Sequence, residues 1–434
     1  MAVKDMETIV SLAKSRGFIY PGSEIYGGLA NSWDYGPLGV ELKNNIKQAW
    51  WEMFVHQRFD MVGIDAALIM NPKTYEASGH LEHFTDPLVE CKECHARHRA
   101  DHLIDPNKCP ACGNSGTMTD PAMFNMMLKT FLGPKEEGAA TVYLRPETAQ
   151  AIFVDFPSIL QTSRKRIPFG VAQIGKAFRN EITPGNFIFR TREFEQMEIE
   201  YFVHENDWEK HFENWLSEMK RWVAFLGLPD EEVVYHEIEA DDLAHYSKRT
   251  VDIEYKFPFG QDELYGLAYR TNYDLSQHQK VSGKDMQYTD PDSGEKYLPH
   301  VIEPSLGVDR TVLAVLCSAY QEEEVGEEKR VVMKLPKELA PFKIAVLPLS
   351  KKPELMEVAK PVWETLSKNW NVDYDLTQSI GRRYRRQDEI GTPYCVTVDF
   401  DSLEDKQVTV RDRDTMKQDR IAIDELESYF QNKL

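Results

Sequence analysis

The stretch from Phe169 to Phe202 constrains the fold more than any other part of the chain. Two runs in which polar and apolar residues alternate are separated by the tetrapeptide Thr183-Pro184-Gly185-Asn186. Proline fixes φ, and glycine or asparagine accepts a positive φ, so the tetrapeptide is typical of a turn. The pattern predicts a hairpin of two strands and commits this part of the chain to an antiparallel sheet.

The two faces of the predicted hairpin differ in chemistry, because residues two apart in a strand share a face. In the first run Gln173, Arg179 and Glu181 share a face opposite Ile174 and Phe178. The second run places four side chains on one face, opposite Met197, Ile199 and Tyr201: Arg192, Phe194, Gln196 and Glu198. Arginine forks suit phosphate oxygens and an aromatic ring can stack on a purine, which favours a nucleotide site. A solvated hairpin with incidental ion pairs is the alternative.

Length and charge limit the class of protein. A chain of 434 residues is expected to form two or three domains. Its 71 acids exceed its 51 bases by 20, which argues against binding nucleic acid by bulk charge. Any such binding would need a local patch, and the densest is Arg382 to Arg386, with Gln387 and Asp388 beside it. The chain has no long apolar segment and no apolar signal core at its start, so we expect a cytoplasmic protein with no membrane partner.

Four of the six cysteines are clustered in two pairs, Cys91-x-x-Cys94 and Cys109-x-x-Cys112. This spacing is typical of a structural zinc site with four thiolate ligands. A disulfide pair, an empty site and a catalytic zinc with the nearby histidines His95, His98 and His102 are the alternatives. Cys317 and Cys395 lie in apolar runs and are expected in the core.

Periodicity and turn residues predict the following elements. Helices are expected over residues 4–16, 37–58, 122–131 and 207–226, and strands over 61–70 and 262–269. Residues 141–150 run from strand into helix, with Glu147 at the helix start, where an acid is also explained by the helix dipole. A strand ends near 303–305 and a helix begins at Gly307, which suits a phosphate, with Arg310 one turn in. A strand-to-helix turn with a surface arginine is the alternative there.

A charged segment, Gln321 to Lys329, is expected to be a mobile connector, and residues 335–341 complete the linker. Beyond it, strands and helices alternate: strands at 342–347, 372–375, 393–400, 408–411 and 420–423, and a helix at 353–368. This order predicts a small α/β domain.

Three groups of residues resemble the motifs of class II aminoacyl-tRNA synthetases, in that family's order. They are a helix and strand ending at Pro72, the hairpin with Arg179-x-Glu181 and Arg192-Glu193-Phe194, and the helix start Gly307-Val308-Asp309-Arg310. In detail, four segments look like the dimeric glycyl-tRNA synthetases of class IIa: Arg145–Gln150, Phe178–Pro184, Arg192–Glu198 and Glu303–Gly307.

The resemblance implies an α+β fold with two domains. Residues 1–335 would form a catalytic domain with an antiparallel sheet flanked by helices, carrying the cysteine insertion 91–112 and an inserted segment at about 205–255. Residues 336–434 would form a C-terminal α/β anticodon-binding domain. Pro72 would lie at the interface of a homodimer.

The implied activity is that of a glycine–tRNA ligase: glycine reacts with ATP to give glycyl adenylate, which passes its acyl group to the 3′ end of tRNA(Gly). Arg179 would hold the α-phosphate and the glycine carboxylate, and Arg310 the γ-phosphate. Phe194 would stack on adenine, and Glu181 would accept from its amino group. Arg179, Arg310 and Glu303 are the implied catalytic residues, and Glu263 and Glu303 the candidate Mg²⁺ ligands.

The resemblance implies two sets of binding residues. The implied ATP contacts are Arg179, Asn180, Glu181, Phe189, Arg190, Thr191, Arg192, Glu193, Phe194, Glu263, Leu264, Gly307, Val308, Asp309 and Arg310. The implied glycine contacts are Arg99, Glu147, Phe194, Glu195, Gln196, Met197, Glu198, Glu303, Pro304, Ser305, Leu306 and Gly307. The acids would bind the ammonium group, and bulk around it would exclude any Cβ.

Two rival functions remain open. One is a class II synthetase for threonine, proline, serine or histidine, which the acid-rich pocket and the segment Glu303–Gly307 disfavour. The other is a synthetase-like binding protein without catalysis, which intact Arg179, Glu181 and Arg310 disfavour.

Overall fold

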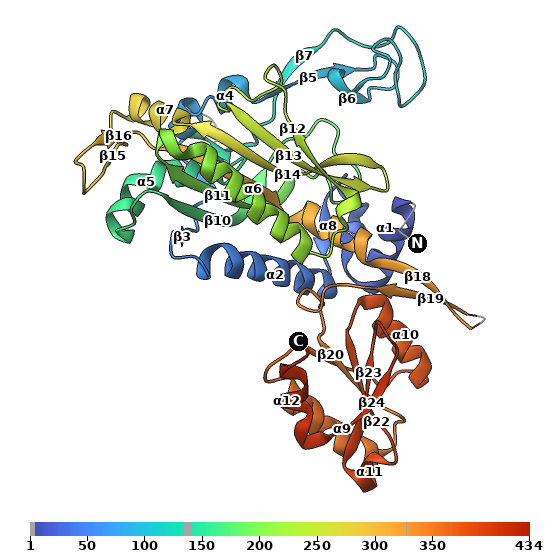
Figure 1. The fold of residues 1–434 in the computed structure, drawn as a ribbon. Helices are drawn as coiled ribbons and strands as arrows, with labels where there is room; N and C mark the ends of the chain where they lie inside the picture. The colour runs from blue at the N-terminus through green and yellow to red at the C-terminus, as the bar shows by residue number, and fades with distance from the viewer. Residues whose placement is uncertain (1–4, 134–139, 327) are drawn as a thin grey trace.

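A seven-stranded sheet forms the centre of the larger of two bodies (Figure 1). The structure, a computed structural model, describes residues 5–133, 140–326 and 328–434. The strand order is β12 (Val233–Glu237), β13 (Arg249–Phe257), β14 (Gly260–Thr271), β17 (His300–Gly307), β11 (Glu193–Val203), β10 (Phe169–Phe178) and β3 (Met61–Gly63). Every neighbouring pair is antiparallel except β10 with β3. The expected α+β fold with an antiparallel catalytic sheet is therefore confirmed.

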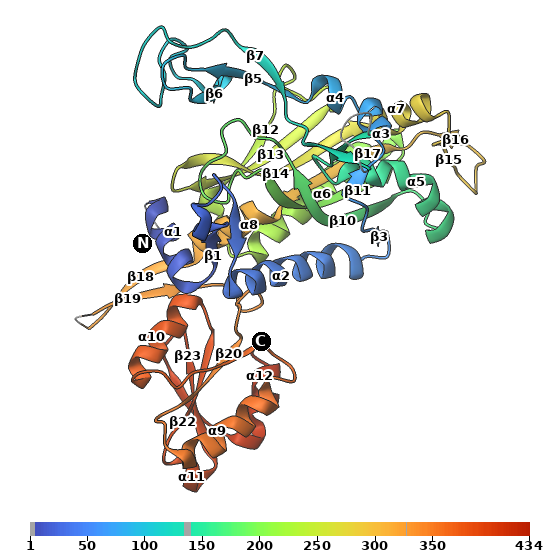
Figure 2. The same cartoon turned by 180° about the vertical axis from the view of Figure 1, so that it is seen from behind.

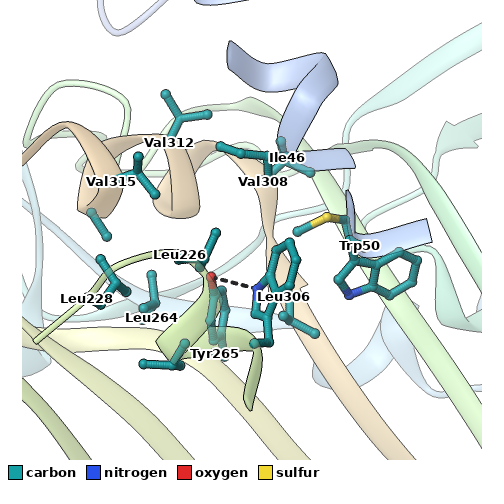
Figure 3. Close-up of a cluster of buried hydrophobic side chains, with 14 of the residues drawn as sticks. Ile46, Trp50, Leu226, Leu228, Leu264, Tyr265, Leu306, Val308, Val312 and Val315 are labelled. Atoms are coloured by element: carbon teal, nitrogen blue, oxygen red, sulfur yellow. Dashed lines mark hydrogen bonds between the residues drawn. The ribbon is translucent and has the colours of Figure 1, made fainter. Parts of the chain in front are cut away.

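Three helices cover one face of this sheet and bury the main core. They are α2 (Pro37–Trp51), α6 (Trp208–Phe225) and α8 (Val308–Ala319). Figure 3 shows Val308 of α8 beside Ile46 of α2, with Val308 and Val312 above the sheet residues Leu264, Tyr265 and Leu306. The apolar stripe of α6 is core, as its spacing predicts, because its Trp222 is fully buried and donates to the Tyr265 hydroxyl at 3.3 Å. The opposite face of the sheet is left for α5 (Ala149–Ser163), α7 (Tyr273–Ser282) and the candidate site.

The N-terminal elements follow the sequence closely. Helix α1 (Met6–Arg16) is capped by Asp5 and ends at Gly17, whose φ of 79° lies in the left-handed region. Helix α2 begins at Pro37 and continues as a π-helical turn over Glu52–His56, so the expected helix to about residue 58 is confirmed. The single strand expected over 61–70 is instead two, β3 and β4 (Ile69–Met70), which pair in different sheets.

The hairpin is confirmed, with a longer connection than the turn signal suggests. Strands β10 and β11 pair from Phe169↔Phe202 to Phe178↔Glu193, so Arg179 lies past the end of its strand. The connection spans 179–192, and its Phe187, Ile188 and Phe189 are buried in the core. These three side chains anchor the connection against the sheet.

Two other expectations are corrected. Residues 122–131 are strands, β7 (Ala122–Asn125) and β8 (Lys129–Leu132), because each extends a neighbouring sheet. The acidic segment from 321 is an antiparallel hairpin, β18 (Tyr320–Val325) with β19 (Glu328–Met333), in which Glu322 and Glu324 are exposed while Arg330 is buried. The segment 205–255, expected as an insertion, supplies α6, β12 and most of β13, and both strands extend the central sheet.

A small module carries the four cysteines and projects from the core (Figure 1, Figure 2). Its sheet has the order β6 (Arg97–Arg99), β5 (Thr85–Glu90), β7. Nearer the core lies a second three-stranded sheet, in the order β4, β9 (Ala140–Leu144), β8.

The C-terminal domain has its own core and a five-stranded sheet. The sheet order is β21 (Val372–Tyr374), β20 (Ile344–Pro348), β22 (Tyr394–Val398), β23 (Gln407–Asp412) and β24 (Gln418–Ala422), with α9 (Pro353–Leu366), α10 (Ile380–Ile390), α11 (Ser402–Asp405) and α12 (Leu426–Gln431) packed on it. The α/β domain is as predicted. The segment before it is no free linker, because Leu335, Leu339 and Ala340 are fully buried.

The arginine patch of the C-terminal domain is only partly a surface. Arg383 is 1% exposed and donates to the carbonyls of Pro348, Leu349 and Asp375. Gln387 and Asp388 are also buried, so none of these three can contact nucleic acid. Among the residues that the structure describes, no helix is both long and apolar enough to cross a lipid bilayer.

Asp60 joins the end of the α2 segment to the central sheet. Arg58 donates to both of its oxygens at 3.0 and 2.7 Å, and the Tyr201 hydroxyl donates at 2.8 Å. Burial alone would raise the pKa of Asp60, but these donors outweigh it and the pKa lies below its ordinary value. A depressed carboxyl pKa stabilises the fold above the unfolded pKa of about 4, and this stabilisation is lost as the pH falls through the folded value.

We expect Asp60→Asn to lower the free energy of unfolding by about 1–3 kcal/mol at pH 7, because charged hydrogen bonds are lost. Urea denaturation at pH 7 and near pH 3 measures this, and the difference should shrink at the acidic pH. Asp292→Asn is the control, since Asp292 pairs with Arg166 on the open surface. An equal loss for Asp60→Asn at both pH values would contradict the prediction.

Candidate active site

Strand β11 lies between two adjoining cavities on the open face of the sheet. The first is lined by Arg179, Glu181, Ile188, Phe189, Arg190, Thr191, Phe194, Glu195, Gln196, Glu263, Leu264, Ser305, Gly307, Asp309 and Arg310. The second is lined by Glu147, Arg179, Gln196, Glu198, Ile238, Asp242, Leu243, Ala244, Tyr246, Thr250, Asp252, Glu263, Gly266, Ala268, Glu303 and Ser305. Four residues border both: Arg179, Gln196, Glu263 and Ser305. A ligand could therefore extend from one cavity into the other past Arg179.

Arg179 and Phe194 form one side of the first cavity. The Arg179 guanidinium lies 5.3 Å from the ring centroids of both Phe194 and Phe84, and its Nε donates to the Pro146 carbonyl at 3.1 Å. These contacts fix the direction of the side chain. The remaining guanidinium donors can bind phosphate or carboxylate oxygens.

Arg310 forms the opposite side. Its guanidinium lies 4.3 Å from the Phe189 ring centroid, and Nη1 donates to the Glu263 carbonyl at 2.7 Å and to the Glu263 carboxylate at 3.2 Å. The Glu263 side chain is 47% exposed, so it can still exchange partners at the cavity mouth. Glu181 contributes a buried carboxylate oxygen that accepts no hydrogen bond from the part of the chain the structure describes.

The second cavity is acidic. Glu198 accepts from the Thr148 N–H at 3.1 Å, the Thr148 hydroxyl at 2.5 Å and the Ser305 hydroxyl at 2.7 Å. Burial, and then the charge of Glu147, raise the pKa of Glu198. Because Glu198 lines the cavity and its pKa is raised, a cation entering the cavity would stabilise its charged form.

Arg270 holds the acids of this cavity in place. It donates to both Glu303 oxygens at 2.9 Å and to both Asp274 oxygens at 2.8 and 2.9 Å. Gln150 then joins Asp274 at 2.9 Å to Glu147 at 3.0 Å. Hydrogen bonds thus run without a break from Glu303 through Arg270, Asp274 and Gln150 to Glu147, and they fix the positions of the two glutamates.

Glu147 also lies 3.5 Å from His80 Nε2. Burial raises the pKa of Glu147, but the charge and hydrogen bond of His80, with Arg270, outweigh it and hold the pKa low. Glu147 is thus the most readily ionised of these acids.

Glu200 is the most unusual acid near the cavity. It is fully buried, its carboxylate lies within 4.8 Å of those of Glu198 and Glu303, and neither oxygen accepts a hydrogen bond from any described residue. Burial, and then the charge of Glu303, raise its pKa well above the ordinary value. The described residues leave this part of the pocket short of positive charge.

The sequence analysis missed several of these residues. Gln150 is only the last residue of the segment Arg145–Gln150, and no motif singles out Arg270, Asp274 or Tyr246, whose ring centroid lies 3.9 Å from the Arg270 guanidinium. Asp252 lines the second cavity; burial and the charges of Glu263 and Glu254 raise its pKa to about 7. The sequence gives one indication of Arg270, because this arginine directly follows the apolar strand expected over 262–269.

Some expected contacts are not brought to the cavities. The side chains of Met197 and Leu306 are buried in the core on the other face of the sheet, where strand alternation directs them, and Val308 of α8 is buried in the same core. Asn180, Arg192, Glu193 and Pro304 do not line either cavity. Arg99 lies on β6 in the cysteine module and pairs with Asp86 and Asp101.

Arg192 nevertheless supports the site. It donates to the carbonyls of Glu181 at 3.1 Å and Ala30 at 3.3 Å. It therefore ties the 179–192 connection to the N-terminal loop.

The four clustered cysteines meet at one point. Cys91 Sγ lies 3.8 Å from Cys112 Sγ, Cys94 Sγ lies 3.7 Å from Cys109 Sγ, and all four sulfurs lie within 4.8 Å of one another. Sulfurs about 2.3 Å from a tetrahedral zinc ion are separated by about 3.8 Å. None of the four is in a disulfide, and the arrangement fits a zinc ion.

Comparison with known proteins agrees with this architecture. A family model for the class II tRNA synthetase core domain (G, H, P, S and T) matches residues 131–319, and one for an anticodon-binding domain matches residues 343–433. A solved prolyl-tRNA synthetase from Cryptosporidium parvum superposes with a TM-score of 0.65 over 98% of this chain and 76% of its own, at 16% identity. The fold and the two cavities define a class II aminoacyl-tRNA synthetase.

Relatives identify the branch of this class. The glycine–tRNA ligase of Lysinibacillus sphaericus is 54% identical over 462 aligned positions, covering 100% of both chains. That of Streptomyces coelicolor is 52% identical over 457, covering 100% of this chain and 99% of its own. The chain belongs to the glycine–tRNA ligases.

Proposed function

We propose that the two cavities divide the glycine–tRNA ligase reaction, with ATP in the first and glycine in the second. The observation that carries this assignment is their junction at Arg179. Activation requires a carboxylate to approach the α-phosphate in line although both are negative. A single guanidinium bordering both cavities can bind the two groups and reduce their repulsion.

Phe194 and Glu181 complete the nucleotide side of the proposal. Adenine would stack on the half-buried Phe194 ring, and its amino group would donate to the free oxygen of Glu181. Arg310 would bind the terminal phosphate after exchanging its contact with Glu263. Glu263 would then be free to bind Mg²⁺, whose preferred ligands are oxygens.

On the glycine side, Glu198, Glu303 and Glu147 would surround the ammonium group, with Ser305 held by Glu198. We assign Glu303 here and not to Mg²⁺, because both of its oxygens already face Arg270 inside the protein. The network through Gln150 and Asp274 leaves little freedom for these acids to move apart. A substrate with a Cβ would have to displace them, which favours glycine.

The reaction needs no protein nucleophile. A glycine carboxylate oxygen attacks the α-phosphorus, the α–β bond breaks, and diphosphate leaves with glycyl adenylate formed. A terminal ribose hydroxyl of tRNA then attacks the acyl carbon, and AMP leaves. The C-terminal domain, matched by the anticodon-binding family, would hold the anticodon end of the tRNA.

We expect ATP–diphosphate exchange that depends on glycine and not on alanine or serine, because the acids crowd the ammonium group. Arg179→Met should reduce the exchange rate at least about 100-fold, since it removes the charge shared by both substrates. Arg166→Met is the matched control, because Arg166 pairs with Asp292 on the surface. Exchange with serine but not glycine would reject the assignment, and no exchange at all would favour a binding protein.

We also propose one structural Zn²⁺ in the cysteine module. The described thiolates leave no open coordination position, so the ion would stabilise β5, β6 and their loops and would not take part in catalysis. The module buries few apolar residues, so the bound metal would supply much of the free energy that keeps it folded.

Elemental analysis of the purified protein should find about one zinc per chain. Cys94→Ser should lose the metal, whereas Cys317→Ser, a buried core position outside the module, should keep it. Wild-type protein without zinc after mild preparation would contradict the site.

We further propose a homodimer formed around Pro72 and the β4–β9–β8 sheet. This surface exposes Leu68, Ile69, Phe131 and Leu132 at 38–51%. Exposed apolar side chains gathered around one small sheet are typical of a covered interface.

Sedimentation equilibrium should give about twice the chain mass of 50.2 kDa. Leu132→Glu should shift the protein toward the monomer, because it introduces a charge into the apolar surface. Met123→Glu, at another exposed apolar position in the cysteine module, is the control. A monomeric wild type at micromolar concentration would reject this proposal.

A further inference from the structure

We propose that Lys43 and Tyr35 are positioning residues for ATP binding, acting through Asp309 to fix the two sides of the ATP cavity relative to each other. The inference rests on the proposed assignment of ATP to the first cavity. Neither residue lines that cavity. Both precede or lie in α2, on the far side of the sheet from the substrates.

Lys43 is a buried ammonium group. Its side chain is 6% exposed, and Nζ lies 2.8 Å from Glu195 Oε2, 3.6 Å from Asp309 Oδ1 and 4.2 Å from the Tyr35 ring centroid. Burial lowers the pKa of Lys43, but the charges of Asp309 and Glu195 outweigh it and raise the pKa overall. The lysine therefore remains charged and compensates two carboxylates that were expected to face ligands.

Asp309 joins three elements through its two oxygens. Oδ1 accepts from the Tyr35 hydroxyl of β2 (Trp33–Tyr35) and faces Lys43 of α2. Oδ2 accepts from the backbone N–H of Glu195 on β11 at 2.7 Å. The N-terminal turn of α8 is thus bonded directly to the backbone of β11.

This bond lies between the residues that face the nucleotide. Phe194 and Gln196 flank Glu195, and Arg310 follows Asp309. All three line the first cavity, with Phe194 and Arg310 on different elements. A change in the Asp309–Glu195 contact would therefore alter the spacing between the Phe194 ring and the Arg310 guanidinium.

Lys47 offers a comparison within the same cluster. Its Nζ lies 3.1 Å from the other oxygen of Glu195 and its side chain is 25% exposed, and within the described part of the chain it forms its ion pair with Glu195 and not with Asp309. If positive charge near Glu195 were sufficient for ATP binding, removing Lys43 or Lys47 would weaken ATP binding equally. If the contact with Asp309 is required, removing Lys43 should weaken it more.

The test is steady-state ATP–diphosphate exchange with Lys43→Met, Lys47→Met and Tyr35→Phe. We expect Lys43→Met to raise the KM for ATP about 10- to 100-fold, as for misplaced binding groups, while the KM for glycine changes less than about twofold. Tyr35→Phe, which removes a single hydroxyl, should raise the KM for ATP in the same direction by a smaller factor. Lys47→Met should change it less than about threefold.

Lys43→Arg keeps the charge and should recover most of the ATP affinity. Thermal unfolding of each variant reports folding separately. If Lys43→Met is poorly folded, Tyr35→Phe decides, because it leaves the ion pair intact.

Equal increases in the KM for ATP and glycine, or equal effects of Lys43→Met and Lys47→Met, would overturn the inference. So would Tyr35→Phe with an unchanged KM for ATP. Absence of glycine-dependent exchange in the wild type would instead reject the proposed function, so the two failures are distinguishable.

Discussion

The buried pairing of Arg270 with Glu303 and Asp274 is the interaction on which the acidic pocket depends. Five carboxylates lie close together in this region: Glu147, Glu198, Glu200, Asp274 and Glu303. Removing a charge from water is costly unless a partner compensates it. Arg270 is fully buried and compensates two of them at once, so the pocket can remain acidic and still fold. The negative charge that Arg270 leaves uncompensated would be neutralised by an incoming ammonium group.

Strand β11 serves both the core and the site through its alternation. Met197, Ile199 and Tyr201 pack beneath the helices, while Phe194 and Glu198 face the cavities. Because of this alternation, each cavity-facing residue of the strand lies between residues that are anchored in the core. The second buried ionic cluster, around Lys43, lies on the helical side and supports the strand from behind.

The sequence predicts the parts of this design that are local. Alternation places Phe194, Gln196 and Glu198 on one face, and the cysteine spacing brings four thiols together. Contacts between distant segments were not predictable in this way: Gln150 meets Asp274 across 124 positions. Residues 122–131 were predicted as a helix because their apolar spacing permits one, whereas pairing with β5 and β9 made them strands. The acidic run after 320 was misjudged for the same reason, since a partner strand outweighed its composition.

The hairpin β18–β19 has a mechanical consequence for the whole molecule. It follows directly from α8, the helix that begins beside Arg310, and Arg330 on its second strand is fully buried against Asp388 of α10 at 2.8 Å. Arg330 also donates to the Arg413 carbonyl. Because the Arg330 side chain is fully buried, water is not at hand to replace Asp388 or the carbonyl as its partner. The C-terminal domain is therefore tied to the segment that continues from α8, and separating the two would require breaking a buried ion pair.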